Sequence, residues 1–472
     1  MQTFSIKQAT IINMVGKYSN VVIQLIINAI LARLLSPEDF GIVAILTVFT
    51  NFFTILSDMG IGTGIIQKKL SKDDYNSIYS FTFFLGIILS LAFILLGIPI
   101  AKIYENNLLF NLCFLLSFSV FFNTINLVPN ALLLKSGEFL AVAFRTIIVN
   151  ICVGIITVVL AFLGFKYYAL ILNSIFVALF TFILTRIKTK LNFTFKIDIS
   201  SLKKIRDIST YQFAFSFINY FSRNSDNMLI GKFLGNSALA YYDKSYKLML
   251  YPNNMLTGVI SSSLHPILSR YQNDPEYIYS KYLKVLEMIS VFGCFIAGFC
   301  YLSSKEIVNI MYGPNWNQSI TSFQILSFSI FSQMFCSSTG AIFQSLGKTK
   351  LQFKAGVITS IMIVSTIIVS LYFNSINYTA LFISIAYNIC FFITFYFLIV
   401  FGFNKSFRIF LKDQSRILIV YIVFLLICML LKMHVVIKNY YISFVFKFSI
   451  SFICYAFLLF LSKRIKSKYK IN

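Results

Sequence analysis

The sequence predicts an all-α polytopic membrane protein with about fourteen transmembrane helices. Composition is the first reason. Of the 472 residues, 58% are hydrophobic, 17% are aromatic and only 12% are charged, and a soluble core cannot enclose that much apolar surface. The second reason is that the apolar residues gather in runs of about 20 residues or more, long enough to cross a bilayer.

These runs follow one another through short connections, so no sizeable soluble domain is expected between them. The predicted helices lie near residues 10–34, 40–66, 77–100, 107–134, 140–163, 167–186, 208–234, 238–265, 280–303, 318–346, 353–373, 377–402, 417–436 and 439–462. We expect no cleavable signal peptide, because the first run is too long and lacks a small-residue cleavage site.

The formal net charge of +24 is explained by membrane topology. In a soluble chain this charge would suggest nucleic-acid binding. Here, if the N-terminus is cytoplasmic, most Lys and Arg residues lie in the tail and in the loops that follow even-numbered helices, including the segments 186–206, 405–416 and 463–470. The positive-inside rule therefore predicts that both termini are cytoplasmic. The basic loops are expected to meet anionic membrane lipids, and no nucleic-acid partner is expected.

The cysteines indicate neither redox nor metal chemistry. All 8 lie within predicted spans and none forms a CxxC pair, so we interpret them as small apolar packing residues. No catalytic residue, cofactor or metal is predicted.

An internal repeat relates the first and seventh predicted helices. Residues 31–42, "LARLLSPEDFGI", align with residues 230–241, "IGKFLGNSALAY", with a turn in both. Extending the alignment backwards matches polar positions in register: Asn13 with Gln212, Lys17 with Ser216, Asn20 with Asn219, Gln24 with Arg223, and Asn28 with Asn227. The spacing i, i+4, i+7, i+11, i+15 falls within about 80° on one helix face.

Polar side chains in hydrocarbon are costly unless they face protein or water, and intramembrane charges commonly mark a substrate or ion path. We therefore expect the two stripes to face each other across a cavity between related halves. The alternative is that these residues join helices: Arg223 would pair with Asp226 at i, i+3, and the asparagines would bond neighbouring helices.

The second predicted helix adds polar residues at helical spacing, Thr47, Thr50, Asn51, Thr54, Ser57 and Asp58. The substrate-binding candidates are Lys17, Asn20, Gln24, Asn28, Asn51, Asp58, Asn219, Arg223, Asp226 and Asn227, and ion coupling is assigned to Asp58 or Asp226. A Lys17–Asp58 ion pair at the inner mouth is a further hypothesis. Lys447, in the last helix, has no partner visible in the sequence and is interpreted as structural or snorkelling.

Several segments resemble the polysaccharide-flippase branch, the Wzx-type proteins, of the multidrug/oligosaccharidyl-lipid/polysaccharide exporter superfamily. These are "LARLLSPEDFGIVAI" (31–45), "SDMGIGTGIIQKK" (57–69), "YFSRNSDNMLIGKFLGNSALAYYDKSYKLMLYP" (220–252), "LHPILSRYQND" (264–274) and "YGPNWNQS" (312–319). The resemblance covers roughly residues 1–350 and, as a hydropathy pattern, the whole chain. Any one segment alone would be a weak signal.

The resemblance implies two related six-helix bundles around a central cavity, plus two C-terminal helices. The expected organisation is an N-terminal bundle (1–190), a cytoplasmic linker (191–207), a C-terminal bundle (208–403), and two additional helices with a basic cytoplasmic tail (404–472). Parallel repeats of this kind suit alternating access by rocking of one half against the other.

The resemblance also implies a substrate, an oligosaccharide on undecaprenyl pyrophosphate that moves from the inner to the outer leaflet of the bacterial cytoplasmic membrane. Surface polysaccharide such as O-antigen, capsule or exopolysaccharide would be the product, and a polymerase and glycosyltransferases would be partners. Lys17 and Arg223 could bind the pyrophosphate, and the amide and hydroxyl side chains could bind sugar hydroxyls.

Three alternative functions stay open. A lipid II-type flippase and a multidrug or organic-cation antiporter belong to the same superfamily, although an antiporter of cations would favour an acidic cavity. A membrane glycosyltransferase, polymerase or ligase would require catalytic carboxylates near the membrane surface and a large outer loop, which the sequence lacks.

Overall fold

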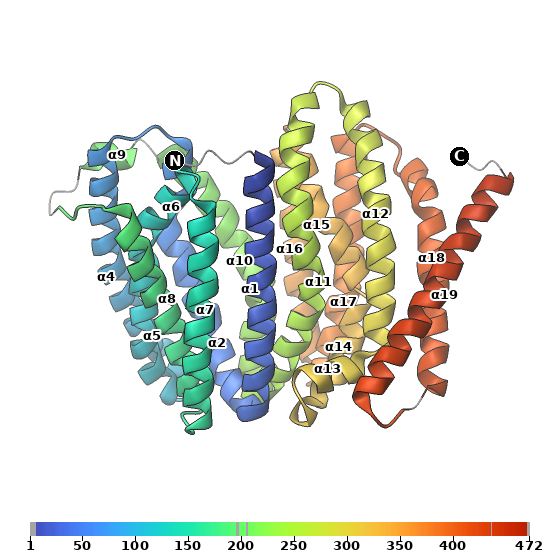
Figure 1. Ribbon diagram of the computed structural model, residues 1–472, viewed down its shortest axis with the longest axis horizontal. Coiled ribbons are helices and arrows are strands. Elements are labelled where there is room, and N and C mark those ends of the chain that lie inside the picture. Colours follow the sequence, from blue (N-terminus) through green and yellow to red (C-terminus); the bar gives the residue numbers. More distant parts are fainter. Residues whose placement is uncertain (1–5, 195–197, 204–205, 436, 470–472) are drawn as a thin grey trace. The chain divides into compact units, whose positions relative to one another are not determined.

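The computed structural model describes residues 6–194, 198–203, 206–435 and 437–469, and every regular element within these ranges is helical (Figure 1). This confirms the all-α prediction. Within the described ranges, 11 spans are long and apolar enough to cross a membrane, or up to 12 if one bent helix pair forms a single span. Each predicted segment overlaps a helix, while the exact number of fourteen spans stays a prediction.

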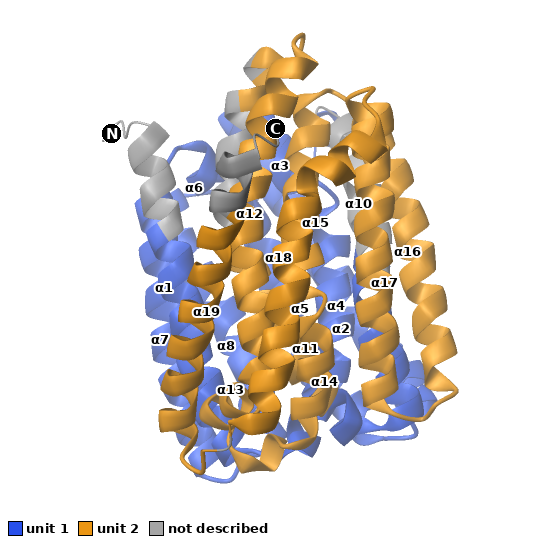
Figure 2. Ribbon diagram, turned by 90° about the vertical axis from the view of Figure 1, so that its right-hand side faces the viewer, with its two compact units in different colours: residues 1–240 blue, residues 241–472 orange. Residues whose placement is uncertain are grey.

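The chain divides into two compact units, residues 1–240 and residues 241–472 (Figure 2). The helices of unit 1 are α1 (Ile6–Leu34), α2 (Pro37–Asp58), α3 (Ile61–Gln67), α4 (Lys72–Ile103), α5 (Leu108–Ile125), α6 (Leu127–Lys135), α7 (Phe139–Phe162), α8 (Tyr167–Thr189), α9 (Ile199–Lys203) and α10 (Arg206–Leu234). Helix α11 (Asn236–Leu268) begins in unit 1 and continues into unit 2. Contacts place α10 with the first unit, whereas the sequence-based division assigns residues 208–234 to the second bundle.

Local sequence sets both ends of α2. Ser36 accepts a hydrogen bond from the backbone N–H of Asp39, and the Asp39 side chain accepts one from the backbone of Ser36, with Pro37 at the first helical position. At the other end, Met59 and Gly60 adopt left-handed conformations with φ of 39° and 75°. The predicted span near 40–66 is therefore broken into α2 and α3, because the chain cannot continue an α-helix through positive φ.

Two contacts attach α10 to the loop after α4. The Tyr104 hydroxyl donates to the Met228 carbonyl at 3.0 Å, and Lys232 lies 2.8 Å from Glu105 in an ion pair. Hydrogen bonding to the Lys232 ammonium lowers the pKa of the Glu105 carboxyl. Because this carboxylate is exposed, the ion pair adds little to the stability of the protein.

Gly41, near the start of α2, lies directly against the backbone at the start of α11. A β-carbon at Gly41 would lie 1.9 Å from the carbonyl oxygen of Asn236. A backbone atom cannot rotate away as the end of a side chain can, so this close approach requires glycine. The turn before α2 and the turn before α11, which correspond in the repeat, are therefore packed together inside unit 1.

We predict that Gly41→Ala destabilises the protein by about 1–3 kcal/mol, because the added methyl group forces the backbones apart. The measurement is the midpoint of thermal unfolding of the purified protein in detergent. Gly356→Ala on α16 (Thr349–Leu371) is the matched control, since nothing lies within 4 Å of a β-carbon there. Equal midpoints for both variants would contradict the close approach at Gly41.

Unit 2 consists of the rest of α11 and of later helices. These are α12 (Pro275–Leu302), α13 (Ser304–Met311), α14 (Gln318–Ser327), α15 (Ile330–Ser345), α16, α17 (Ile376–Tyr396), α18 (Phe407–His434) and α19 (Tyr440–Tyr469), with short turns η1 (Ser269–Tyr271), η2 (Pro314–Trp316) and η3 (Phe397–Gly402). Helices α14 and α15 meet at 55° and correspond to the single predicted segment 318–346. Helices α18 and α19 pack on α12.

A buried ion pair attaches α19 to α13. Lys447 Nζ lies 2.7 Å from Glu306 Oε1, which also accepts a hydrogen bond from the Ser443 hydroxyl at 2.7 Å. Lys447 is 5% exposed and Glu306 is 3% exposed. The sequence left two roles open for Lys447, a structural one and snorkelling to the membrane surface. Because its ammonium is buried in the unit and paired with Glu306, its role is structural.

Removing one charge of this pair should be more damaging than removing both. We predict that Lys447→Met destabilises the protein by about 3–5 kcal/mol, because the Glu306 carboxylate is left buried and uncompensated. The double variant Glu306→Leu/Lys447→Met should recover most of this loss. Thermal unfolding in detergent checks the series, with Lys438→Met, at an exposed lysine, as control. A double variant as unstable as Lys447→Met would refute the coupling.

Candidate functional site

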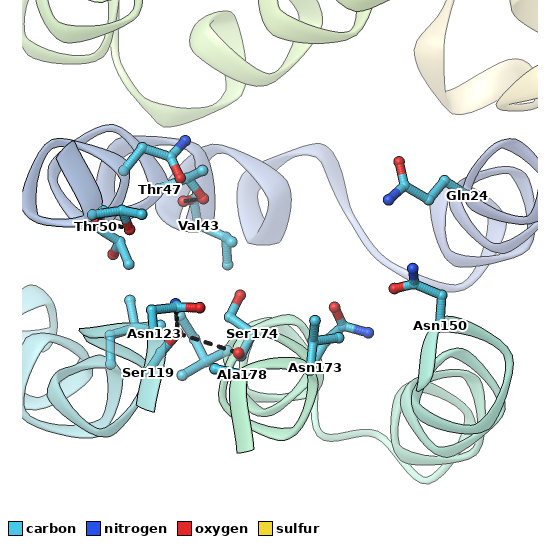
Figure 3. A pocket seen from close by; sticks show the side chains of 15 residues that line it. Gln24, Val43, Thr47, Thr50, Ser119, Asn123, Asn150, Asn173, Ser174 and Ala178 are labelled. Carbon is cyan, nitrogen blue, oxygen red and sulfur yellow. Dashed lines mark hydrogen bonds between the residues drawn. The ribbon is translucent and has the colours of Figure 1, made fainter. Parts of the chain in front are cut away.

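A polar cavity of about 250 Å³ lies inside unit 1, between α1, α2, α5, α7 and α8 (Figure 3). Most of its lining side chains are neutral amides and hydroxyls: Gln24, Thr47, Thr50, Asn51, Thr54, Ser119, Asn123, Asn150, Asn173 and Ser174. Among the described residues that line the cavity, none is charged. Neutral donors and acceptors enclosed by apolar helices are suited to a ligand with many hydroxyl groups.

One wall of the cavity is a face of α2. Thr47, Thr50, Asn51 and Thr54 recur at helical spacing, as the sequence predicts. The Thr47 and Thr50 hydroxyls donate to backbone carbonyls one turn earlier, at 2.7 and 2.8 Å. Their donors are therefore used within the helix, while their oxygen atoms can still accept a hydrogen bond.

The other walls are joined by amide hydrogen bonds between helices. Asn150 of α7 donates to Asn20 Oδ1 of α1 at 2.6 Å, and Asn173 of α8 donates to the Thr157 hydroxyl of α7 at 2.7 Å. Asn123 donates to the Ser119 hydroxyl at 3.3 Å, within α5. These amides are positioned by neighbours, so the cavity has a defined shape before any ligand arrives.

Gln24 and Asn51 differ from these amides. Both line the cavity, both are exposed, and neither side chain forms a hydrogen bond in the part of the chain that the structure describes. Figure 3 shows Gln24 of α1 opposite Asn150. These two amides have their full hydrogen-bonding capacity for a ligand.

The structure brings only some of the predicted residues of α1 and α2 into this cavity. Gln24 and Asn51 line it, and Asn20 supports its wall through Asn150. Asn28 donates to the Gln24 carbonyl of its own helix at 2.8 Å, and Lys17 is exposed outside the cavity.

The hypothesis of a Lys17–Asp58 ion pair is wrong for this structure. Asp58 Oδ1 instead accepts a hydrogen bond from the backbone N–H of Gly62 at 3.1 Å, where it caps the start of α3. Within the described residues no ion pair joins Lys17 to Asp58. The break at Met59 and Gly60 explains this, because it creates free N–H groups beside the carboxylate.

The described polar side chains of α10 are absent from the lining of this cavity. Arg223 is exposed, and among the described side chains it forms no ion pair with Asp226. Asp226 is 3% exposed, and its Oδ1 accepts from the backbone N–H of Asn227 at 2.8 Å. Asn227 Oδ1 is buried without a hydrogen-bond partner, and the side chain of Asn219 lies outside the described residues.

Packing explains why α10 stays apart from the cavity. The Tyr220 hydroxyl donates to the Val48 carbonyl, so α10 lies against α2, whereas α1 packs against α7. The alternative that Arg223 forms an ion pair with Asp226 at i, i+3 is wrong for the described side chains.

Sequence reasoning missed Asn123, Asn150 and Asn173 as site residues. Each is an amide inside a strongly apolar predicted span, and that property alone could have identified them. They do not repeat along one helix, so a search for polar stripes passes over them. Among the described residues, no group of three or more His, Cys, Asp or Glu side chains could hold a metal ion.

We predict that Asn150→Leu lowers stability by roughly 0.6–2 kcal/mol, because Asn20 loses its donor from α7. Gln24→Leu is the matched control, since it removes an amide of the same cavity that has no protein partner. Thermal unfolding of both purified variants distinguishes the two roles. An equal loss in Gln24→Leu would mean that Gln24 is also structural.

Comparison with known proteins identifies a family and a fold. A family described as "Polysaccharide biosynthesis protein" matches residues 30–321. An "Uncharacterized membrane protein in cps region" of Klebsiella pneumoniae is 25% identical over 379 residues, which cover 74% of this chain and 72% of that protein. The "Lipopolysaccharide biosynthesis protein WzxC" of Escherichia coli is 23% identical over 348 residues, 72% of this chain and 70% of that one.

The "Amylovoran biosynthesis protein AmsL" of Erwinia amylovora is 23% identical over 329 residues, 68% of this chain and 83% of that one.

Among solved structures, the lipid II flippase MurJ in an inward closed conformation matches 96% of this chain and 99% of its own, with a TM-score of 0.75 and 16% identity. An inward-facing MATE multidrug transporter matches 84% of this chain and 94% of its own, with a TM-score of 0.65 and 14% identity. This chain therefore shares its fold with these two transporters.

Proposed function

This chain belongs to the polysaccharide biosynthesis protein family, and on that premise we propose that it is a flippase for lipid-linked oligosaccharide. The substrate is an oligosaccharide on undecaprenyl pyrophosphate, which the protein moves from the inner to the outer leaflet of the bacterial cytoplasmic membrane. The supporting observation is the cavity of unit 1, because a membrane-embedded site of neutral amides and hydroxyls matches the surface of a sugar. The product is surface polysaccharide, as O-antigen, capsule or exopolysaccharide.

We assign this cavity to a single sugar ring, and its size supports that assignment. Its volume of about 250 Å³ lies below the roughly 300–1,000 Å³ of pockets for drug-sized ligands. Gln24 and Asn51 would each offer a donor and an acceptor to vicinal hydroxyls, and the α2 threonines would accept. The remaining sugars of the oligosaccharide would lie outside this cavity.

The pyrophosphate requires cations, and Lys17 and Arg223 are the candidates in the membrane-embedded part of unit 1. Both are exposed, and neither forms an ion pair within the described residues. Arg223 can bind phosphate oxygens with two parallel hydrogen bonds, whereas Lys17 acts as a point charge. In this assignment the carbohydrate and the pyrophosphate are bound by different residues, the neutral cavity and the two cations.

The proposed orientation has both termini in the cytoplasm, where the basic loops lie. Transport proceeds by alternating access, and Asp226 or Asp58 would couple it to an ion. Glycosyltransferases supply the substrate on the inner leaflet, and a polymerase uses it on the outer leaflet. An organic-cation antiporter is disfavoured, because the cavity of unit 1 carries no carboxylate among its described lining residues.

We predict that Gln24→Leu/Asn51→Leu reduces export of the polysaccharide about tenfold, since two neutral hydrogen bonds of about 0.7 kcal/mol each are lost. The measurement is the leaflet distribution of lipid-linked oligosaccharide in a strain that depends on this protein. Thr366→Val on α16, far along the chain and outside the lining, is the control. Normal export by the double variant would refute a sugar site in this cavity.

The cationic residues give a separate prediction. Arg223→Ala and Lys17→Ala should each leave the lipid-linked oligosaccharide on the inner leaflet, while the protein is still present in the membrane at normal amounts. Arg223→Lys should restore export only partly, because an ammonium cannot form the two parallel bonds of a guanidinium. Full export by all three variants would mean that neither residue binds the pyrophosphate.

A further inference from the structure

A second large cavity, of about 740 Å³, lies inside unit 2 between α12, α18 and α19. Its lining residues come from the first half of α12, the first part of α18 and the last part of α19. The beginnings of α12 and α18 and the end of α19 lie at the same end of the unit (Figure 1). None of its lining residues belongs to the sugar cavity or to the cationic residues of unit 1. This cavity is therefore distinct from the residues to which the sugar and the pyrophosphate are assigned.

The chemistry of the lining changes with depth. At the end of the helices it is ionic, with Lys284, Glu287, Lys412, Asp413 and Arg416. Further along α18 it is apolar, with Ile419, Val420 and Val423, and α19 adds Leu458 and Leu461 to the apolar lining. Val423 lies seven residues beyond Arg416 on α18, which is about 10 Å along the helix axis.

The ionic part is not satisfied by the protein itself. Within the described residues, none of its five ionisable side chains takes part in an ion pair. Arg416 Nη2 donates to the Ser462 hydroxyl at 3.1 Å, while its Nε is buried and has no hydrogen-bond partner among the described residues. Gln414 is 7% exposed and lines the same cavity, and within the same part of the chain its Oε1 has no partner either.

We propose that this cavity binds one glycerophospholipid of the adjacent leaflet. Arg416 and Lys412 bind the phosphodiester, and the acyl chains lie along Ile419, Val423 and Leu458. The rest of the head group carries hydrogen-bond donors. The carboxylates of Glu287 and Asp413 and the amide oxygen of Gln414 accept hydrogen bonds from these donors. A site with cations alone would bind any phosphate-containing ligand. Carboxylates beside the cations favour a phospholipid whose head group has hydroxyl or ammonium donors, such as glycerol or ethanolamine.

The depth profile supports a lipid over a soluble anion. An ionic mouth followed by an apolar wall reproduces the boundary between head group and acyl chain in a bilayer leaflet. A soluble phosphate would leave the apolar part of the cavity without a partner. The basic loops at this end of the protein would also enrich anionic lipids nearby.

The test uses the full-length protein, purified in detergent and stripped of lipid. Palmitoyl-oleoyl phosphatidylglycerol, phosphatidylethanolamine and phosphatidylcholine are added separately, and bound lipid is counted by native mass spectrometry. These lipids share a phosphodiester and acyl chains, but choline has no hydrogen-bond donor. We expect phosphatidylglycerol or phosphatidylethanolamine to bind about tenfold more tightly than phosphatidylcholine. The preferred lipid tells whether hydroxyl or ammonium donors are recognised.

Variants locate the site. Lys412→Gln/Arg416→Gln should weaken binding of the preferred lipid about tenfold. The matched control is Lys350→Gln/Lys354→Gln, which removes two exposed cations of α16 outside the cavity. Val423→Trp should weaken binding by filling the apolar part while every charge is kept. If Lys412→Gln/Arg416→Gln fails to fold, lipid binding by Val423→Trp tests the location of the site instead.

Three results would overturn the proposal. Equal binding of phosphatidylcholine would show that no head group is recognised, and equal loss in the α16 control would show nonspecific charge attraction. Displacement of the preferred phospholipid by an equal amount of undecaprenyl phosphate would likewise reassign the cavity to isoprenoid lipid.

Discussion

The absence of water from a bilayer core governs this structure, since a polar group that enters it without a hydrogen-bond partner is costly. The Glu306–Lys447 pair is the strongest case. Two opposite charges on α13 and α19 are almost completely buried, with Ser443 as a third partner. Burying two charges is costly, and removing one of them leaves the other buried without a partner, which is more costly. The pair therefore determines which face of α19 packs against α13.

The same constraint shapes unit 1 at a smaller scale. Arg145, inside α7, donates to Asn130 at 3.1 Å and to Thr185 at 2.6 Å, and so joins three helices. Asn150 and Asn173 join helices around the cavity in the same way. These intramembrane polar groups are therefore structural, and the informative residues are those whose polar groups face a cavity without a described protein partner.

That distinction separates two kinds of site. The cavity of unit 1 is neutral throughout its described lining, whereas the cavity of unit 2 mixes unpaired charges with an apolar wall. A neutral site can bind hydroxyl groups and release them again at little cost, as a transporter must with its substrate. A site with charges at head-group depth favours a ligand that stays at the membrane boundary. Carbohydrate in the first and phospholipid in the second are consistent with these chemistries.

The sequence by itself determined the membrane class, the all-α fold and the approximate helix positions, because hydrophobic length is a local property. Its polar periodicity also selected Gln24 and Asn51, which line the cavity of unit 1, while the expected cavity between the two halves stays a prediction. It could not pair Lys447 with Glu306, or Asn150 with Asn20, because these partners lie far apart in the chain and no local rule joins them.

Only the tertiary structure decided which polar residues are satisfied. The left-handed residues Met59 and Gly60 turned Asp58 into a helix cap, and the packing of α10 on α2 kept Arg223 away from the cavity that Gln24 lines. A periodic pattern defines the face of a helix on which a side chain lies. What that face meets depends on contacts between distant segments, and these form only when the helices pack.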